Sequence, residues 1–320
     1  MRTRSGLLAA TVPLAAALLA SACSSSSSSS TQAAAGSSSS SAAPAAKIVA
    51  IGAENEYADV ISQVGGKYVQ ASAILSNPNT DPHTFEASPA VARTMSTARL
   101  IVQNGVGYDD WATTMENADP SDGRQVINVQ KLLGLPDSTP NPHLWYKPST
   151  MPAVANAVAA DLGKIDSAHA SYYKANAAKF IASLSAWNQA LAAFKSAHPN
   201  TPVATTEPVA DYMLEAAGTK NLTPWSFQAD IMNDTDPAPQ DVAIQKSLFT
   251  EHKVKVFLYN QQVTDALTES YIKLANENGI PVVGVYETMP TPGYTYQSWM
   301  EAEVNAMNKA VTSRVSTEKL

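Results

Sequence analysis

Two short stretches of the chain carry nearly the same arrangement of residues around a histidine. Residues 81–85 (Asp-Pro-His-Thr-Phe) and 141–145 (Asn-Pro-His-Leu-Trp) each place a histidine directly after a proline and two residues before a large aromatic side chain. The proline ring fixes a backbone dihedral, so the chain before each imidazole has little freedom. The chain has only five histidines, and neutral imidazole is the commonest protein ligand for a transition metal. The pair therefore predicts two metal ligands, His83 and His143.

Two acidic residues stand where apolar runs end in the second half of the chain. Glu207 follows residues 203–206 (Val-Ala-Thr-Thr), and Glu287 follows residues 282–286 (Val-Val-Gly-Val-Tyr). A solvated loop carboxylate is the ordinary alternative for either residue. Together with the two imidazoles, however, they would supply four protein ligands to one divalent ion. Catalytic metal sites usually keep a coordination position open for water or substrate. A complete set of protein ligands therefore favours transport of the ion over catalysis.

The residues around these positions predict alternating strands and helices. In the first half, strands are expected at 47–51, 69–75 and 100–104, and helices at 55–64 and 89–96. In the second half, strands are expected at 202–206, 254–259 and 280–286, and helices at 209–217 and 264–278. This α/β rhythm predicts two mainly parallel sheets flanked by helices, and ligands bind at the carboxyl ends of such strands. The Gly105-x-Gly107 pair lacks a third glycine and is interpreted as a tight turn.

A long helix is predicted between the two halves, from Asp166 to His198. Its apolar residues recur every three or four positions, which gives one continuous stripe along a helix: Tyr173, Ala177, Phe180, Leu184, Trp187, Leu191 and Phe194. About thirty residues at 1.5 Å each span roughly 45 Å, enough to run along two domains. We interpret it as a rigid connection, although a surface helix packed on one domain has the same pattern.

The N-terminus has the pattern of an export signal with a lipid attachment site. Arg2 and Arg4 precede an apolar run at 6–20, and residues 19–22 (Leu-Ala-Ser-Ala) precede Cys23, the only cysteine. This order predicts a signal peptide at 1–22, lipidation of Cys23 and anchoring to the outer side of the cell membrane. Residues 23–46, nearly all Ser and Ala, are predicted to be a disordered tether. The formal net charge of −7 argues against nucleic acid as a partner.

The chain resembles the solute-binding lipoproteins of zinc and manganese ABC importers, the cluster A-I or TroA-like family. The resemblance rests on residues 80–86 (Thr-Asp-Pro-His-Thr-Phe-Glu), 104–108 (Asn-Gly-Val-Gly-Tyr) before Trp111, 141–145, and 293–296 (Gly-Tyr-Thr-Tyr). It implies an N-terminal lobe at 47–165, a linking backbone helix at 166–198 and a C-terminal lobe at 199–320. It also implies a monomer without enzymatic activity, which binds one metal between its lobes. A permease with a cytoplasmic ATPase would receive the metal.

The resemblance also suggests a role for each proposed ligand. His83 and His143 fall in the first and second ligand motifs of the family. The third ligand is His in many zinc-type members and Glu in many manganese-type members, and Glu207, with Tyr212 five residues later, resembles the Glu version. The fourth ligand is usually Asp, where this chain offers Glu287 and, as an alternative, Asp265.

The identity of the transported metal stays open between Zn²⁺ and Mn²⁺, with Fe²⁺ as a third candidate. Two carboxylates make the ligand set oxygen-rich, which suits Mn²⁺ or Fe²⁺, whereas zinc binds most such sites more tightly. Many zinc-specific relatives carry a His-rich loop, and residues 109–140 contain no histidine. We expect capture with little domain motion, and an affinity that falls as the pH drops through the histidine range.

Three other functions are alternatives or additions to metal transport. A siderophore or corrinoid binding protein shares the long-helix architecture but calls for a broad aromatic or Arg-lined cleft. An exported metal-dependent hydrolase calls for a His-Glu-x-x-His or Gly-x-Ser-x-Gly motif, and the sequence has neither. An adhesin role is compatible with metal binding, and no residue pattern tests it.

Overall fold

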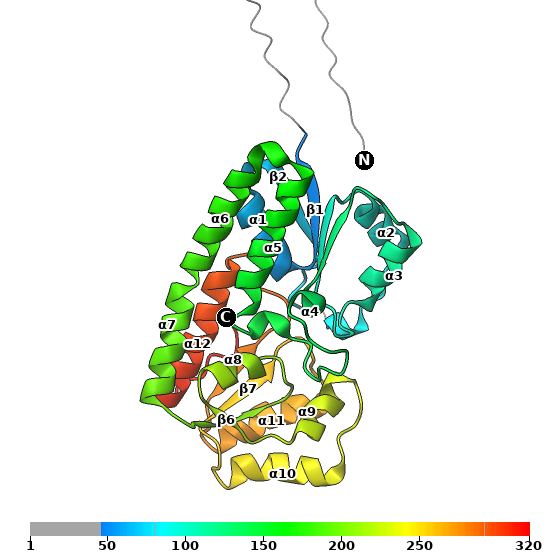
Figure 1. Cartoon of the computed structure of the whole chain (residues 1–320). Coiled ribbons are helices and arrows are strands. Elements are labelled where there is room, and N and C mark those ends of the chain that lie inside the picture. Colours follow the sequence, from blue (N-terminus) through cyan, green and yellow to red (C-terminus); the bar gives the residue numbers. More distant parts are fainter. Residues whose placement is uncertain (1–45, 80, 291) are drawn as a thin grey trace, which may run out of the picture. The chain divides into compact units, whose positions relative to one another are not determined.

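The predicted α/β rhythm of the first half forms one parallel sheet in the computed structural model, which describes residues 46–79, 81–290 and 292–320 (Figure 1). The predicted signal peptide, Cys23 and nearly all of the tether lie outside these residues. The sheet has the order β2-β1-β3-β4. Its strands are β1 (Ile48–Glu54), β2 (Val69–Leu75), β3 (Leu100–Gln103) and β4 (Gln125–Asn128). Buried apolar residues line both central strands, Leu100, Ile101 and Val102 in β3 and Ala50, Ile51 and Ala53 in β1, as expected for strands covered on both faces.

The second half builds another parallel sheet with the equivalent strand order, β6-β5-β7-β8. Its strands are β5 (Pro202–Thr205), β6 (Lys220–Asn221), β7 (Val256–Asn260) and β8 (Val282–Val285). We refer to the parts around the first and second sheets as the N lobe and the C lobe. The predicted fold class is confirmed: two sheets of parallel strands, each flanked by helices.

Shorter helices flank both sheets, and several are close to their predicted ranges. The N lobe contains α1 (Asn55–Gly65), α2 (Pro89–Ser96), α3 (Asp110–Ala118) and α4 (Val129–Leu132). The C lobe contains α8 (Asp211–Ala216), α9 (Trp225–Met232), α10 (Pro239–Thr250) and α11 (Ala266–Glu277). Single 3₁₀ turns lie at Gly66–Tyr68, Pro82–Thr84, Leu144–Tyr146 and Ser167–His169.

The predicted linking helix consists of two helices that run end to end, α6 (Ala170–Ser183) and α7 (Ser185–Ala197) (Figure 1). Leu184 joins them and keeps right-handed helical dihedrals, with φ −74° and ψ −4°. All seven residues of the predicted apolar stripe are buried. Asp166 does not cap the helix through a backbone N–H; its carboxylate instead lies 2.7 Å from Nδ1 of His169 and accepts a hydrogen bond from Tyr173.

Two further long helices, which the residue patterns did not predict, pack beside this connection. Helix α5 (Thr150–Ile165) packs on α6 and α1, and α12 (Tyr296–Ser313) packs on α7. Thr295 and Ser298 form a capping box at the start of α12. One hydrophobic core runs from Leu100 of the first sheet through these helices to Leu258 of the second. Among the described residues, no helix is both long enough and apolar enough to cross a membrane.

The C-terminal tail covers the outer edge of β8. Gly284 donates its backbone N–H to the carbonyl of Thr317 at 2.9 Å, and Thr317 donates to the carbonyl of Val282 at 2.8 Å. The tail runs parallel to β8 at this bridge. A Cβ on Gly284 would lie 1.9 Å from the carbonyl oxygen of Glu318, so the tail fits only against a glycine.

Candidate metal centre

The four predicted ligands lie on loops that follow strands or enter short turns. His83 lies in the 3₁₀ turn after β2, and His143 directly precedes the turn at Leu144–Tyr146. Glu207 and Glu287 come two residues after the ends of β5 and β8. Both carboxylates therefore leave the carboxyl edge of the second sheet, where ligands of parallel sheets bind.

Three of these side chains meet at one point. Nε2 of His83 is 3.0 Å from Oε2 of Glu287, and Nε2 of His143 is 3.2 Å from the same oxygen. His83, His143 and Glu287 each offer one ligand atom, and these atoms all lie within 4.8 Å of one another. The histidines come from the N lobe and the glutamate from the C lobe, so the cluster joins the two lobes.

Glu207 lies beside this cluster but outside it. The amide Nδ2 of Asn260 donates to Oε1 of Glu207 at 3.0 Å and to Oε1 of Glu287 at 2.7 Å, so it bridges the two carboxylates. Glu207 is buried, and its Oε2 has no hydrogen-bond partner within the described part of the chain. The alternative ligand Asp265 caps α11 by accepting a hydrogen bond from the backbone of Thr268.

Asn141 fixes the orientation of His143. Its Oδ1 accepts the backbone N–H of His143 at 3.0 Å and lies 2.8 Å from the ring Nδ1. With a metal ion bound, this contact would hold the ring proton on Nδ1 and present the Nε2 lone pair to the ion. The amide of Asn141 also donates to the carbonyl of Pro208 at 2.7 Å, which holds this loop against the C lobe.

The protonation of the cluster follows from its burial and its one strongly acidic member. Burial alone would lower the pKa of His83, but the Glu287 carboxylate raises it to about 9. Burial opposes ionisation of Glu287 as well, yet the two histidines lower its pKa on balance. Burial lowers the pKa of His143. Without a cation, therefore, a protonated His83 neutralises Glu287, while His143 is neutral.

Burial and the charge of Glu287 raise the pKa of Glu207 well above its usual range. The cluster consequently holds its single negative charge on Glu287. A divalent cation would provide the positive charge that allows the second carboxylate to ionise as well.

Tyr108 and Gln262 belong to the site, although the prediction from residue types did not include them as site residues. Tyr108 donates its hydroxyl to Oε2 of Glu287 at 3.0 Å. It follows the predicted tight turn, where Gly105 and Gly107 have φ of 81° and 76°. Gln262 accepts the backbone N–H groups of Glu287 and Thr288 at 2.7 and 2.8 Å and so fixes the loop. Tyr108 stood in a stretch that carried the family resemblance, whereas no pattern marked Gln262.

The other three histidines lie directly before α6, directly after α7 and in a surface turn. His169 is half-exposed and stacks on the ring of Tyr68, with centroids 3.7 Å apart. His198 packs against Phe194, and His252 is in an exposed turn with φ of 51°. None of them belongs to the three-residue cluster.

A comparison with protein families matches residues 53–310 to the zinc-uptake complex component A family, described as periplasmic. The chain belongs to this family. It is a solute-binding protein of an ABC uptake system for a divalent metal, it acts outside the cytoplasm, and it is not an enzyme. The resemblance inferred from the sequence is confirmed, and the hydrolase alternative is wrong.

Individual relatives are distant in sequence but similar over most of their length. The manganese-binding lipoprotein MntA of Bacillus subtilis is 21% identical over 280 residues, which cover 80% of this chain and 87% of MntA. The iron-binding protein YfeA of Yersinia pestis is 24% identical over 266 residues, 78% of this chain and 82% of YfeA. The structure of FpvC from Pseudomonas aeruginosa, solved with Mn²⁺, has a TM-score of 0.68 at 20% identity and covers 84% of this chain and 99% of FpvC.

Proposed function

We propose that His83, His143 and Glu287 bind the transported metal ion between the two lobes. The convergence of two imidazole Nε2 atoms on one carboxylate oxygen supports this proposal, because these three groups lie within 4.8 Å of one another. Their separation is short enough for one small ion to contact all three after slight outward movement. The ion would replace the proton that otherwise neutralises Glu287.

Glu207 is our proposed fourth ligand. Its Oε2 is buried and lacks a hydrogen-bond partner among the described residues. Such an oxygen is costly to leave unpaired, and coordination would satisfy it. The amide of Asn260 donates to both glutamates, so Glu207 lies next to Glu287 and would reach the ion by turning its side chain.

We favour Mn²⁺ as the cargo, with Zn²⁺ as the competitor. Two imidazoles and two carboxylates form a harder set of ligands than three imidazoles would, and hard oxygen ligands suit Mn²⁺. A relative named for manganese and a related structure holding Mn²⁺ support this choice, whereas the family description names zinc and another relative is named for iron. Zinc binds most nitrogen and oxygen sites more tightly, so availability outside the cell would decide which ion is loaded.

Capture is proposed to need little movement of the lobes. The hydrophobic core is continuous from one sheet to the other, and separating the lobes would expose it. The ligand loops would therefore close around the ion while α5, α6, α7 and α12 stay in place. In the proposed division of the chain, the N-terminal lobe spans 47–165, the linking helix 166–198 and the C-terminal lobe 199–320.

Delivery is proposed to occur at the membrane. Signal-peptide cleavage before Cys23 and lipidation of that residue would anchor the chain, and the relative MntA is named a lipoprotein. Residues 23–46 would then give the lobes enough reach to meet an ABC permease, which passes the metal on as its cytoplasmic ATPase works. The chain would act as a monomer.

Thermal unfolding in the presence of metal tests the ligand set. The full chain, with metal removed by a chelator, is melted with added Mn²⁺, Zn²⁺ or Fe²⁺. An ion that binds only the folded chain raises the free energy of unfolding by about 2.7 kcal/mol at a hundred times its Kd. We expect a higher melting temperature for the wild type and a smaller shift for His83→Ala, His143→Ala and Glu287→Gln.

His198→Ala is the matched control, because it removes an imidazole outside the cluster. Its metal-induced shift should equal that of the wild type. A wild type that none of the three ions stabilises would contradict the proposal. Full stabilisation of both histidine variants would contradict the ligand assignment and leave the family assignment intact.

A further inference from the structure

The loop that carries Glu287 is bound to the N lobe through the side chain of Asn55. Nδ2 of Asn55 donates to the carbonyl of Met289 at 2.8 Å, and the backbone N–H of Met289 donates to Oδ1 of Asn55 at 2.8 Å. One amide thus satisfies both backbone groups of Met289. Asn55 is 7% exposed and Met289 is 4% exposed, so both hydrogen bonds are shielded from water. They join two residues that are 234 positions apart in the sequence and belong to different lobes.

Asn55 comes from a well-fixed part of the N lobe. It follows β1 directly and is the first residue of α1. Strand β1 lies between β2 and β3 in the first sheet, and His83 and Tyr108 lie on the loops that follow those two neighbours. The amide of Asn55 therefore leaves the same edge of the same sheet as residues of the metal centre. Its side chain is free to reach Met289, because Glu54 rather than Asn55 occupies the capping position of α1.

A second contact holds the same loop on the other side of Glu287. Tyr146 donates its hydroxyl to the carbonyl of Tyr286 at 2.9 Å, and its oxygen accepts the backbone N–H of Tyr286 at 3.4 Å. Tyr146 ends the 3₁₀ turn that follows His143, and it is fully buried. This contact fixes the chain where it leaves β8. Asn55 fixes the chain beyond Glu287.

The clamp between Asn55 and Met289 differs from the direct contacts of Glu287. The Nε2 atoms of His83 and His143 lie 3.0 and 3.2 Å from Oε2 of Glu287. A bound ion would occupy the lone pairs of both nitrogens, so coordination would replace these two contacts. The clamp uses no ligand atom. It can therefore be the same in the empty and in the loaded protein.

We propose that Asn55 is a positioning residue of the metal centre, whose amide holds Glu287 at the distance from the two histidines at which all three bind one ion. This inference rests on the proposed role of Glu287 as a ligand. Gln262 fixes the loop within the C lobe, through the N–H groups of Glu287 and Thr288. Asn55 fixes its place relative to the N lobe. Without the amide, the N–H and C=O of Met289 would be buried without partners, and a shift of the loop toward water would relieve this.

The first test measures the affinity and the release of Mn²⁺, with the full chain in detergent micelles. Asn55→Ala should raise the Kd in calorimetry by about 10–100-fold, the usual effect of removing a residue that orients a ligand. The change should lie mainly in the dissociation rate, as it does for most changes at a binding site. Mixing the loaded protein with excess chelator gives this rate from the fluorescence of Trp145, whose ring centroid lies 5.4 Å from that of His143.

A double variant separates positioning from a general effect on the fold. If Asn55 acts through Glu287, Asn55→Ala should change the Kd of a Glu287→Gln chain by less than about threefold. A substitution that only loosens the fold would weaken both chains by the same factor. Circular dichroism checks that every variant folds. Asn55→Ser is a second, milder variant, since a single short hydroxyl cannot make both bonds to Met289, and it should weaken binding in the same direction.

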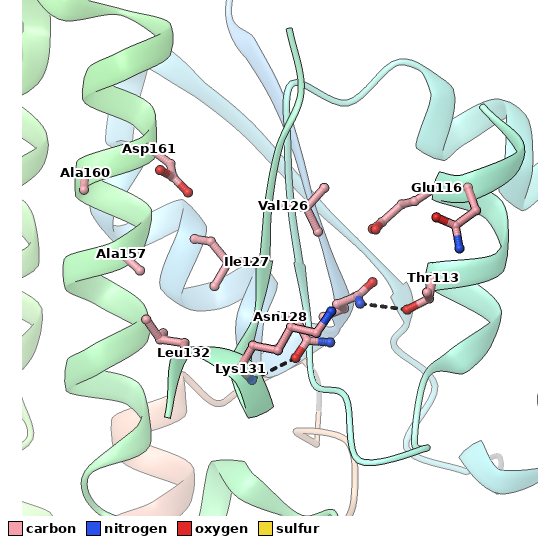
Figure 2. Close-up of a pocket in the computed structure, with 12 residues that line it drawn as sticks. Thr113, Glu116, Val126, Ile127, Asn128, Lys131, Leu132, Ala157, Ala160 and Asp161 are labelled. Carbon is pink, nitrogen blue, oxygen red and sulfur yellow. Dashed lines mark hydrogen bonds between the residues drawn. The ribbon is translucent and has the colours of Figure 1, made fainter. Parts of the chain in front are cut away.

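Asn128→Ala is the matched control. Asn128 also stands at the carboxyl end of a strand of the first sheet, where it ends β4. Its Oδ1 accepts the backbone N–H of Lys131 at 3.0 Å and so caps α4 inside the N lobe, beside the groove between α3 and α5 (Figure 2). The control removes an asparagine contact of similar length that does not join the lobes. Its Kd and dissociation rate for Mn²⁺ should equal those of the wild type.

Three results would overturn the inference and leave the proposed ligands in place. Asn55→Ala and Asn55→Ser bind Mn²⁺ as tightly as the wild type, while Glu287→Gln binds it weakly. Asn55→Ala weakens the wild type and the Glu287→Gln chain by the same factor. Asn128→Ala weakens binding as much as Asn55→Ala does. A Glu287→Gln chain with the affinity of the wild type would instead remove Glu287 from the ligands, and the role of Asn55 with it.

Discussion

The two loops that carry the Pro-His motif, residues 81–85 and 141–145, have the same local structure but different surroundings. Asp81 and Asn141 each accept the backbone N–H of the histidine two residues later, at 2.8 and 3.0 Å. Yet the side chain of His83 is 23% exposed, while that of His143 is fully buried and held by Asn141 at Nδ1. The pKa is raised for His83 and lowered for His143. A repeated motif thus places two ligands, and the packing around each determines how it holds its proton.

The largest effect should come from removing the buried histidine. His143→Ala takes away a ligand and removes one buried partner from each of Asn141 and Glu287, so Mn²⁺ affinity should fall more than about 100-fold. His83→Ala should cost less, because water can reach the more exposed position and take its place. Isothermal titration calorimetry measures both. An equal loss, or a larger one for His83→Ala, would show that burial does not separate the two ligands.

The residues that hold the two loops should differ in the same direction. Asn141→Ala removes the contact that orients His143 and should lower Mn²⁺ affinity by about 10–100-fold. Asp81→Ala removes only a backbone contact before His83 and should lower it less than about tenfold. The same titration compares them. If Asp81→Ala proves the more damaging, the orientation assigned to Asn141 is wrong.

The pH dependence of binding should reflect His83. Its pKa of about 9 means that it carries a proton at neutral pH, and a metal must displace that proton. Affinity should therefore increase by at least about tenfold per pH unit as the pH rises toward about 9. Calorimetry at one pH in buffers of different ionisation enthalpy should detect about two protons released, one from His83 and one from Glu207. His83→Ala should release about one proton fewer than the wild type, and an equal release from both proteins would refute the assignment.

A smaller effect concerns Glu303, a buried acid with a different environment from Glu287. Its Oε1 accepts hydrogen bonds from Trp299 and Tyr146, at 3.0 and 3.2 Å, and burial raises its pKa to about 8. The folded chain thus keeps a proton that the unfolded chain loses above its ordinary pKa of 4.5. The free energy of unfolding should decrease between these values as the pH rises, by up to about 1.4 kcal/mol per unit.

Glu303→Gln should remove that slope, since an amide does not titrate. Urea unfolding at about pH 5 and pH 8 compares the variant with the wild type. Equal slopes in both proteins would mean that Glu303 is ionised in the folded chain. Glu303 would then resemble Glu287, the buried acid whose pKa is lowered.

Much of the fold was accessible from local patterns. The apolar stripe from Tyr173 to Phe194 predicted the linking helices, and the alternation of strands and helices predicted both parallel sheets. Helix α5 was missed because many of its less buried positions are alanine (Ala153, Ala157 and Ala160), so its buried stripe has little polar contrast to mark its period. The break at Leu184 was also missed, because its residues continue the apolar stripe without proline or glycine.

The candidate site was accessible where a motif or a strand end marked it. His83 and His143 were marked by their repeated motif, and Glu287 by its place after an apolar run. The position of Glu207 outside the cluster could not be predicted, because it depends on Asn260, whose amide reaches both glutamates across two strands. Such contacts depend on how strands lie beside one another, and the residues involved are 27 to 53 positions apart in sequence.

The continuous core limits how this protein can be divided or recombined. Each lobe has a smaller core of its own, but side chains of both sheets and of α5, α6, α7 and α12 belong to one larger core, so neither lobe completes that larger core alone. We therefore expect the lobes to melt in one transition, and a protease cut at Leu184 to leave no stable half. A chimera that takes one lobe from a relative would have to take the matching faces of α5, α6, α7 and α12 with it.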